Sequence, residues 1–278
     1  MDAAASIGSE AVQGQRRFSG LDRLYGVRGG AAIRASHVVV VGLGGVGSWA
    51  AEALARSGVG ALTLIDLDHV SESNINRQVQ ATELTVGQAK VEAMRDRITQ
   101  VHPGCIVRGV EEFVDEGNWP QLCPAGADAV IDACDQVKAK TAMAAWALRS
   151  RSRFVSVGAA GGKRLAHAVD IDDLARTTHD PLLAQLRYRL RKFHGAAREG
   201  RAIGIACVFS REAVAAPDAS CEVAGDGSLN CSGYGSVVSV TATFGLCAAG
   251  WVLDRLAAGS DSTAQDTPAA RKQPVPTL

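Results

Sequence analysis

The feature that most constrains the fold of this chain is a glycine-rich turn directly after a β-branched run. Residues 37–41 read His-Val-Val-Val-Val, and Gly-Leu-Gly-Gly-Val-Gly follows at 42–47, before an alanine-rich stretch. Between a strand and a helix, this G-x-G-x-x-G spacing lets backbone N–H groups approach phosphate closely, and the helix N-terminus favours negative charge. The sequence therefore predicts a phosphate-binding turn. Its expected ligand-binding glycines are Gly42, Gly44, Gly45 and Gly47.

Strand and helix patterns alternate on both sides of this turn. Further strands are predicted at 61–66, 105–110, 128–132 and 153–157, with helices at 45–56, 88–100 and 137–150. Such alternation predicts an α/β fold with a Rossmann-like, mainly parallel sheet and helices on both faces. From about 163 to 236 the alternation becomes irregular and charged residues increase. We expect an irregular, substrate-facing elaboration there.

The two ends of the chain differ in composition from its centre. Residues 1–15 and 259–278 are rich in Ala, Ser, Thr, Pro and Gln without periodicity, so we expect flexible tails. Residues 16–258 are predicted to form a single domain. With 278 residues, 47% of them apolar, such a chain can bury a large core without disulfide or metal support.

The sequence also indicates a cellular compartment. Seven cysteines form no C-x-x-C pair, and the N-terminal Met-Asp-Ala-Ala-Ala-Ser lacks the basic and apolar parts of a signal peptide, so a cytoplasmic location is expected. The uncharged stretch 227–253 is long enough to cross a bilayer. Its many Ser, Thr, Asn and Gly residues favour a buried strand or loop followed by a core helix instead.

Charge is balanced over the whole chain but not locally. With 29 basic and 29 acidic residues, a protein that grips nucleic acid over its entire surface is excluded. Between residues 187 and 201, however, six basic residues face one acid, Glu199, which gives a net charge of +5. This segment fits either a solvated basic helix face or a contact with a phosphate backbone. The basic residues are Arg187, Arg189, Arg191, Lys192, Arg198 and Arg201.

The residues after the glycine turn indicate which nucleotide it binds. Asp66 lies 22 residues after Gly44, where a carboxylate can accept hydrogen bonds from ribose hydroxyls, as in NAD-binding proteins. Arg77 and Lys90 add two cations near the turn, which a triphosphate needs and hydride transfer does not. The run Asp-Ala-Cys-Asp at 132–135 ends a neighbouring strand, and one of its carboxylates can hold Mg²⁺. Together these residues predict a triphosphate site.

At these positions the chain resembles the adenylating family that includes ThiF, MoeB, HesA and the ubiquitin-activating enzymes. The resemblance implies an enzyme that uses ATP and Mg²⁺ to convert a carboxylate into an acyl-adenylate, and that works as a homodimer. It implies that Asp66 binds ribose, that Arg77 and Lys90 hold the triphosphate, and that Asp135 binds Mg²⁺. The other expected nucleotide-binding residues are Asp68, Asn74, Asn76 and Gln78.

A segment near the N-terminus carries a second part of this resemblance. Arg-Phe at 17–18 and Arg-Leu-Tyr-Gly at 23–26 resemble the family segment that sends an arginine into the site of the partner subunit. Arg23 is therefore expected to act across a dimer.

The resemblance narrows to one branch of the family, the tRNA threonylcarbamoyladenosine dehydratases, over roughly residues 17–257. It implies ATP-dependent closure of the threonylcarbamoyl group on the adenosine next to the anticodon, with loss of water, to a cyclic hydantoin. A tRNA would then be held by the basic segment 187–201 and by the loop 158–162. The shared runs lie at 44–56, 76–78, 158–162, 180–181, 207–210 and 241–245.

Three other functions remain open from the sequence. One is adenylation of the C-terminus of a small ubiquitin-like sulfur-carrier protein, although the zinc-binding C-x-x-C pairs of many such relatives are absent. Another is a sulfur-relay role with a cysteine desulfurase and sulfur acceptor, for which Cys231 in a Gly- and Ser-rich loop is the expected thiol. An NAD dehydrogenase is favoured least. A monovalent cation in the site is also left open.

Overall fold

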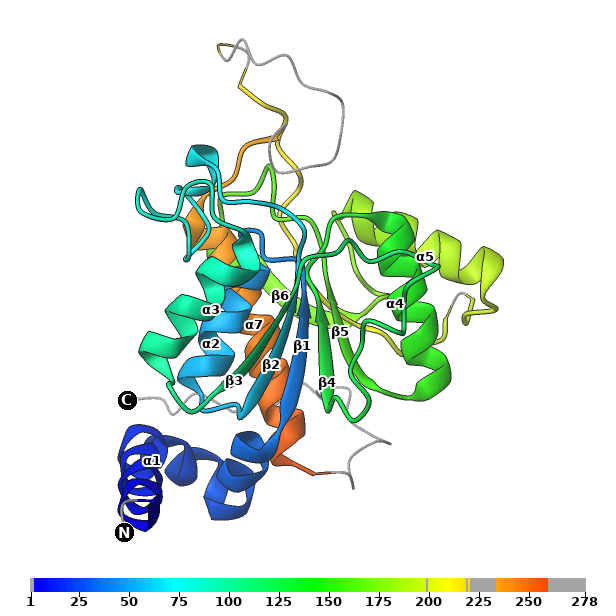
Figure 1. The fold of residues 1–278 in the computed structure, drawn as a ribbon. Helices are drawn as coiled ribbons and strands as arrows, with labels where there is room; N and C mark the ends of the chain where they lie inside the picture. The colour runs from blue at the N-terminus through cyan, green and yellow to red at the C-terminus, as the bar shows by residue number, and fades with distance from the viewer. Residues whose placement is uncertain (1–2, 199, 219, 221–233, 260–278) are drawn as a thin grey trace, which may run out of the picture.

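The structure, a computed structural model, describes residues 3–198, 200–218, 220 and 234–259, with side chains described from residue 16 onward (Figure 1). The described residues form one seven-stranded sheet in the order β3-β2-β1-β4-β5-β7-β6. All neighbouring strands are parallel except the edge pair β6–β7, which is antiparallel. The strands are β1 His37–Val41, β2 Ala61–Ile65, β3 Ile106–Val110, β4 Ala129–Asp132, β5 Arg153–Val157, β6 Val169–Asp173 and β7 Ala206–Ser210.

Helices cover both faces of this sheet. Figure 1 shows α2, α3 and α7 on one face and α4 and α5 on the other. The α/β fold with a mainly parallel, Rossmann-like sheet is therefore confirmed. The helices are α1 Ala3–Ala35, α2 Gly47–Arg56, α3 Lys90–Val101, α4 Val137–Ser150, α5 Pro181–Phe193 and α7 Val238–Ala257, with short 3₁₀ turns η1 Glu72–Asn74 and η2 Ala166–Ala168.

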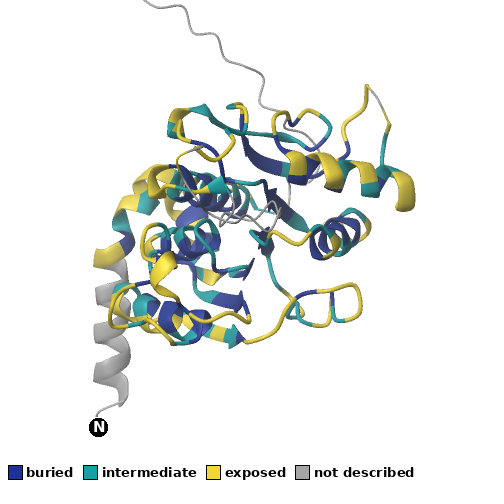
Figure 2. Ribbon diagram, turned by 90° about the horizontal axis from the view of Figure 1, so that it is seen from above, coloured by how far each residue is buried: buried dark blue, intermediate teal, exposed yellow. Residues whose placement is uncertain are grey.

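The four valines of β1 that follow His37 are all buried because both faces of the strand are covered. Val38 and Val40 join the core beneath α2, α3 and α7, whereas Val39 and Val41 join the core beneath α4 and α5. Figure 2 shows buried residues concentrated in the strands and on the inner sides of the helices. The two cores fix the sheet between its helical layers, so the turns at the strand ends are held on a rigid base.

The last described helix accounts for most of the uncharged stretch at 227–253. From Val238 onward this stretch belongs to α7, which packs closely on α2. A Cβ atom at Gly245 would lie 2.4 Å from the carbonyl oxygen of Val46, so only glycine allows this approach. The expected core helix is confirmed, and none of the helices in the described residues is long and apolar enough to cross a membrane.

Two segments are more regular than the sequence indicates. Residues 3–15, expected to form a tail, continue α1 to its start at Ala3; their alanines and the absence of proline favour helix. The segment 163–236, expected to be irregular, supplies α5 and two strands of the main sheet. There β7 lies beside β5, and β6 forms the antiparallel edge.

Candidate active site

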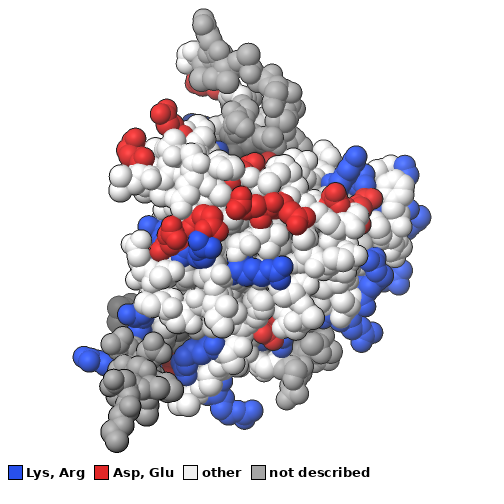
Figure 3. Space-filling view, viewed as in Figure 1, with Lys and Arg blue, Asp and Glu red and all other residues white. Residues whose placement is uncertain are grey.

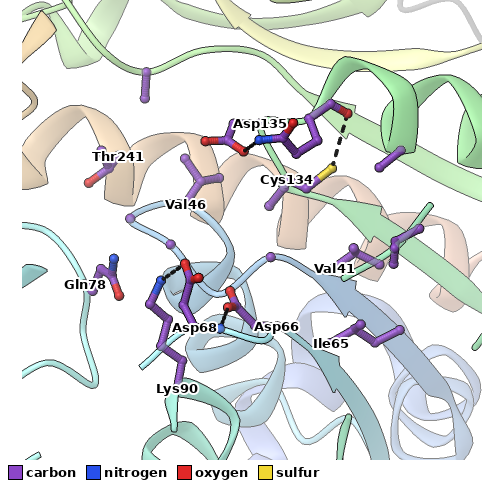
Figure 4. A pocket seen from close by; sticks show the side chains of 18 of the residues that line it. Val41, Val46, Ile65, Asp66, Asp68, Gln78, Lys90, Cys134, Asp135 and Thr241 are labelled. Carbon is purple, nitrogen blue, oxygen red and sulfur yellow. Dashed lines mark hydrogen bonds and ion pairs between the residues drawn. The ribbon is translucent and has the colours of Figure 1, made fainter. Parts of the chain in front are cut away.

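The carboxyl ends of the parallel strands surround a cavity of about 490 Å³ (Figure 4). It opens at β1, which lies between β2 and β4. The strand order changes direction here, because β2 and β3 lie on one side of β1 and β4 to β7 lie on the other. In parallel α/β sheets this is the position at which ligands bind. The cavity brings together most of the residues that the sequence selects. These are Gly42, Gly44, Gly45, Asp66, Asp68, Asn74, Arg77, Gln78, Lys90 and Asp135.

The glycine turn forms one wall of the cavity. Gly42 has φ 86°, a left-handed conformation that favours glycine, and a Cβ at Gly44 would meet no atom within 4 Å. Gly47 does not line the cavity, because it packs on the turn: a Cβ there would lie 1.7 Å from the carbonyl oxygen of Gly42. The residue before α2, Val46, provides no side-chain cap, so the start of the helix is suited to an anionic ligand.

Asp66 joins the glycine turn to the loop after β2. Its Oδ2 accepts a hydrogen bond from the Leu43 N–H at 2.5 Å, and its Oδ1 accepts one from the Asp68 N–H at 2.8 Å. Burial raises the pKa of Asp66, while the Lys90 charge and these two donors oppose the rise. The carboxylate thus fixes two loops and still lines the cavity.

Two cations reach the cavity from different elements. Lys90 begins α3 and is buried, and its Nζ lies 2.8 Å from the Asp68 Oδ2. Arg77 donates hydrogen bonds to the Ser73 carbonyl at 2.6 Å and to the Asn76 Oδ1 at 2.9 Å. Figure 4 shows Lys90 and Asp68 pointing toward one another beside the loop that carries Val46. Lys90 has two further donors available for an anion such as phosphate.

The two aspartates of the 132–135 run have separate positions. Asp135 is exposed and lines the cavity, with the Gln136 Nε2 3.3 Å from its Oδ1. Asp132 is fully buried outside it, where its Oδ2 lies 3.0 Å from the Lys140 Nζ and accepts from the Ser156 hydroxyl at 2.7 Å. Within the described residues no group of three His, Cys, Asp or Glu side chains can hold a metal ion. A Mg²⁺ ion at Asp135 fits only if phosphate and water supply its other ligands, which is its usual coordination.

Some of the expected site residues lie away from the cavity. The Nδ2 of Asn76 donates to the Ser236 carbonyl at 3.0 Å, which fixes the chain before α7. Arg23 is exposed on α1, ahead of a kink at Gly26, and Figure 1 shows α1 beyond the edge of the sheet opposite the cavity. Cys231 lies outside the described residues.

The basic segment is divided by its contacts. Arg187 donates to the carbonyls of Leu174 and Thr177, and Arg191 donates to the Ala197 carbonyl, so these two side chains stabilise the fold. Arg189 and Lys192 lie 5.6 and 5.1 Å from the ring centroid of Phe193. Arg198 and Arg201 are exposed. Figure 3 shows Lys and Arg gathered along the margin formed by α4 and α5.

Two parts of the cavity were not predicted from the sequence. Phe113, which follows β3, lines it and is 59% exposed; nothing but its place after a strand end indicates this role. The start of the loop 158–162, expected to contact tRNA, forms a wall of the cavity through Gly158, Ala159 and Ala160. The cavity therefore has an apolar end at Phe113, Val41 and Ile65, and a polar end at the glycine turn.

A glycine turn at the switch point of a parallel sheet, a carboxylate after the second strand and two converging cations define a Rossmann-like nucleotide-binding protein. The sequence matches the ThiF family over residues 18–271, and the chain belongs to that family.

Several characterised proteins are similar to this chain. It is 42% identical to the tRNA threonylcarbamoyladenosine dehydratase of Escherichia coli, over 88% of this chain and 94% of that protein, and 38% identical to the Bacillus subtilis protein of the same name, over 70% and 75%. The crystal structure of the Escherichia coli enzyme in complex with ATP superposes with a TM-score of 0.80 over 88% of this chain and 95% of that one. The molybdopterin-synthase adenylyltransferase of Escherichia coli is 40% identical over 45% of this chain and 50% of its own.

Proposed function

We propose that this chain is an ATP-dependent tRNA threonylcarbamoyladenosine dehydratase that acts in the cytoplasm. The observation that carries the proposal is the cavity itself, which combines a phosphate turn with Asp66, Arg77, Lys90 and Asp135. The similarity to proteins of that name extends over nearly the whole chain and supports the same conclusion.

The reaction requires activation of a carboxylate. Oxide is a poor leaving group, so the substrate carboxylate first attacks the α-phosphorus of ATP and displaces pyrophosphate, which gives an acyl-adenylate. The other nitrogen of the urea, the exocyclic N6 of the adenosine, then attacks the acyl carbon to close the five-membered ring, AMP leaves, and the proton of that nitrogen is lost. The second step is intramolecular. Orientation of the nitrogen beside the acyl carbon therefore lowers its barrier by roughly several kcal/mol, as in intramolecular model reactions. No covalent intermediate with the enzyme is needed.

Each part of the cavity suits one part of ATP. The glycine turn and the start of α2 bind phosphate, Asp66 accepts from ribose hydroxyls, and Arg77 with Lys90 binds the charge that develops on displacement of pyrophosphate. Gln78 and the buried Asn74 line the same wall and complete the polar surface. The apolar end at Phe113, Val41 and Ile65 is left for adenine.

A Mg²⁺ ion fits at Asp135, the exposed carboxylate of the cavity. When bound, the ion neutralises phosphate charge and orients the triphosphate. We also propose that a monovalent cation binds at the polar end of the cavity. Replacing K⁺ with Na⁺ in the dehydration assay tests this proposal.

A homodimer would complete the site. Arg23 lies toward the edge of the sheet opposite the cavity, so it cannot be expected to serve the site of its own chain. In a dimer it can enter the partner's site, where a further cation would bind phosphate. Mixed dimers of the inactive variants Arg23→Ala and Lys90→Ala should regain activity in one of their two sites. No recovery in verified mixed dimers would contradict the proposal.

The tRNA is proposed to lie across the margin of α4 and α5. Lys192, Arg198 and Arg201 are exposed there and would bind the phosphate backbone, whereas Arg187, Arg191 and Arg189 contact other parts of the fold. Replacing Lys192 and Arg201 by glutamine should raise KM for tRNA and leave the ATP Kd unchanged. A role of Cys231 with a cysteine desulfurase and sulfur acceptor is separate from this reaction and is not needed for it.

One second function is supported by a specific observation. The similarity to a molybdopterin-synthase adenylyltransferase covers 45% of the chain and favours adenylation of a small sulfur-carrier protein. ATP–pyrophosphate exchange separates the two functions. We expect exchange to depend on tRNA that carries threonylcarbamoyladenosine, with no response to carrier proteins ending in Gly-Gly; the reverse result would favour the second function.

A further inference from the structure

Four buried charged side chains lie behind the cavity wall formed by 158–160. Asp132, Lys140, Lys163 and Asp180 are each at most 6% exposed, and none of them lines the cavity. They comprise two acids and two cations. Asp132 pairs with Lys140 at 3.0 Å, and the Lys163 Nζ donates to the carbonyls of His179 at 3.1 Å and Glu212 at 2.8 Å. Buried charges of this kind are costly unless each is satisfied.

Asp180 links this cluster to the cavity wall. Its Oδ2 accepts a hydrogen bond from the Ala159 N–H at 2.9 Å, and its Oδ1 accepts one from the Leu183 N–H at 2.9 Å. The second bond caps the start of α5. A Cβ at Gly158 would lie 2.0 Å from the same Oδ2, so a glycine is needed for the wall to reach the carboxylate. One side chain therefore fastens the cavity wall to the first turn of a helix.

A helix cap alone does not require this arrangement. Serine, threonine or asparagine caps a helix with one oxygen and no charge. Burial raises the pKa of Asp180, and the Leu183 N–H, the Lys163 charge and the Ala159 N–H oppose the rise. The second oxygen, directed to Ala159, is what a simple cap would lack.

The place of the wall in the cavity indicates its use. The glycine turn, Asp66 and Phe113 suit phosphate, ribose and base, and the wall 158–160 lines the same cavity, where a substrate carboxylate can approach it. The other end of the link is α5, which carries the exposed Lys192 on the proposed tRNA surface. Asp180 thus joins the two parts of the protein that would contact the tRNA.

We propose that Asp180 is a positioning residue: it holds the wall 158–160 in register with α5, so that the tRNA carboxylate meets the α-phosphate. The inference rests on the proposed function, since it assumes that adenylation takes place in this cavity.

The variant Asp180→Asn separates the two bonds. Asparagine keeps an oxygen for the Leu183 N–H and so still caps α5, but its amide NH₂ then faces the Ala159 N–H and cannot accept from it. We expect kcat for dehydration to fall about tenfold to a hundredfold, as small misplacements of reacting groups cause. The ATP Kd should stay within about twofold, because Asp180 does not contact the nucleotide-binding residues.

A charge-balanced double variant distinguishes positioning from simple stability. Asp180→Asn removes one of the two carboxylate charges, those of Asp180 and Glu212, that favour the charged form of Lys163, and the double variant Asp180→Asn/Lys163→Gln removes the cation as well. Its unfolding temperature should recover toward that of the wild type, while kcat remains low because the Ala159 bond is still missing. Asp128→Asn is the matched control: Asp128 directly precedes β4, and its carboxylate also accepts a backbone hydrogen bond, from the N–H of His37 at the start of β1, at 2.8 Å.

Hydrogen exchange of the peptide around residues 155–162 gives a readout that does not depend on the reaction. The amides of this peptide should exchange at least fivefold faster in Asp180→Asn and in Asp180→Asn/Lys163→Gln than in the wild type, and at the wild-type rate in Asp128→Asn. A fivefold change in the opening equilibrium corresponds to about 1 kcal/mol. Unchanged exchange, wild-type kcat in Asp180→Asn, or a kcat that recovers together with stability in the double variant would each overturn the positioning role. A wild-type protein that never dehydrates the tRNA would contradict the proposed function instead, and the exchange result would still decide the role of Asp180.

Discussion

Replacing Phe113 by alanine tests the assignment of the apolar end of the cavity to adenine. The ring lines the cavity and is 59% exposed, so it is available to stack on a base. Removal of an aromatic ring from a stacked base costs about 1–3 kcal/mol. The ATP Kd should therefore rise about fivefold to 150-fold. Because the ring is mostly exposed, the free energy of unfolding should change by no more than about 0.5 kcal/mol.

The assay is titration calorimetry with two ligands. ATP should bind more weakly to Phe113→Ala, whereas inorganic tripolyphosphate, which lacks a base, should bind as it does to the wild type. Phe193→Ala is the matched control, because Phe193 is 56% exposed on α5 and does not line the cavity. Phe113→Tyr should keep nearly full ATP affinity. An ATP Kd that changes less than twofold, or an equal loss of tripolyphosphate affinity, would refute the base assignment.

Three further predictions concern the nucleotide-binding residues, a buried ion pair and a buried thiol. Lys90→Ala and Asp135→Asn should each abolish adenylation without loss of folding, and normal turnover in either variant, checked by AMP release and circular dichroism, would contradict the ATP site. Lys140→Met should lower the free energy of unfolding by about 3–5 kcal/mol in urea titration, because it leaves the Asp132 carboxylate buried and unpaired; a loss below about 1 kcal/mol would show that the pair is dispensable. Burial raises the pKa of the Cys105 thiol to about 11, so this cysteine should resist iodoacetamide at pH 8 in peptide mapping, and rapid labelling would contradict its environment.

The parts of the fold that the sequence predicted are those with strong local patterns. After His37 the run at 37–41 is valine at every position because both faces of β1 are covered, and its predicted bounds match β1. α4 and β5 are likewise predicted at their observed bounds. The edge strand β6 carries three aspartates in five residues and has no fully buried position, so only the short alternation of Val169 and Ile171 with aspartates marks it.

The candidate site was predicted where single residue types carry the chemistry. Asp66, Arg77, Lys90 and Asp135 lie around one cavity because parallel strands end at one edge of the sheet. The roles of Arg187 and Asp180 depend on which backbone groups their side chains reach, and such long-range contacts have no local signal. A basic residue in a charged run can equally bind RNA or support a loop, and only its hydrogen bonds distinguish these roles.

Nucleoside mass spectrometry tests the central claim most directly. Purified protein would be incubated with ATP, Mg²⁺ and tRNA that carries threonylcarbamoyladenosine, in buffers that do not reopen the hydantoin, with ATP omitted as the control. The account predicts loss of one water from that nucleoside only when ATP is present, with AMP formed in equal amount. An unchanged nucleoside mass with a protein that binds ATP would contradict it.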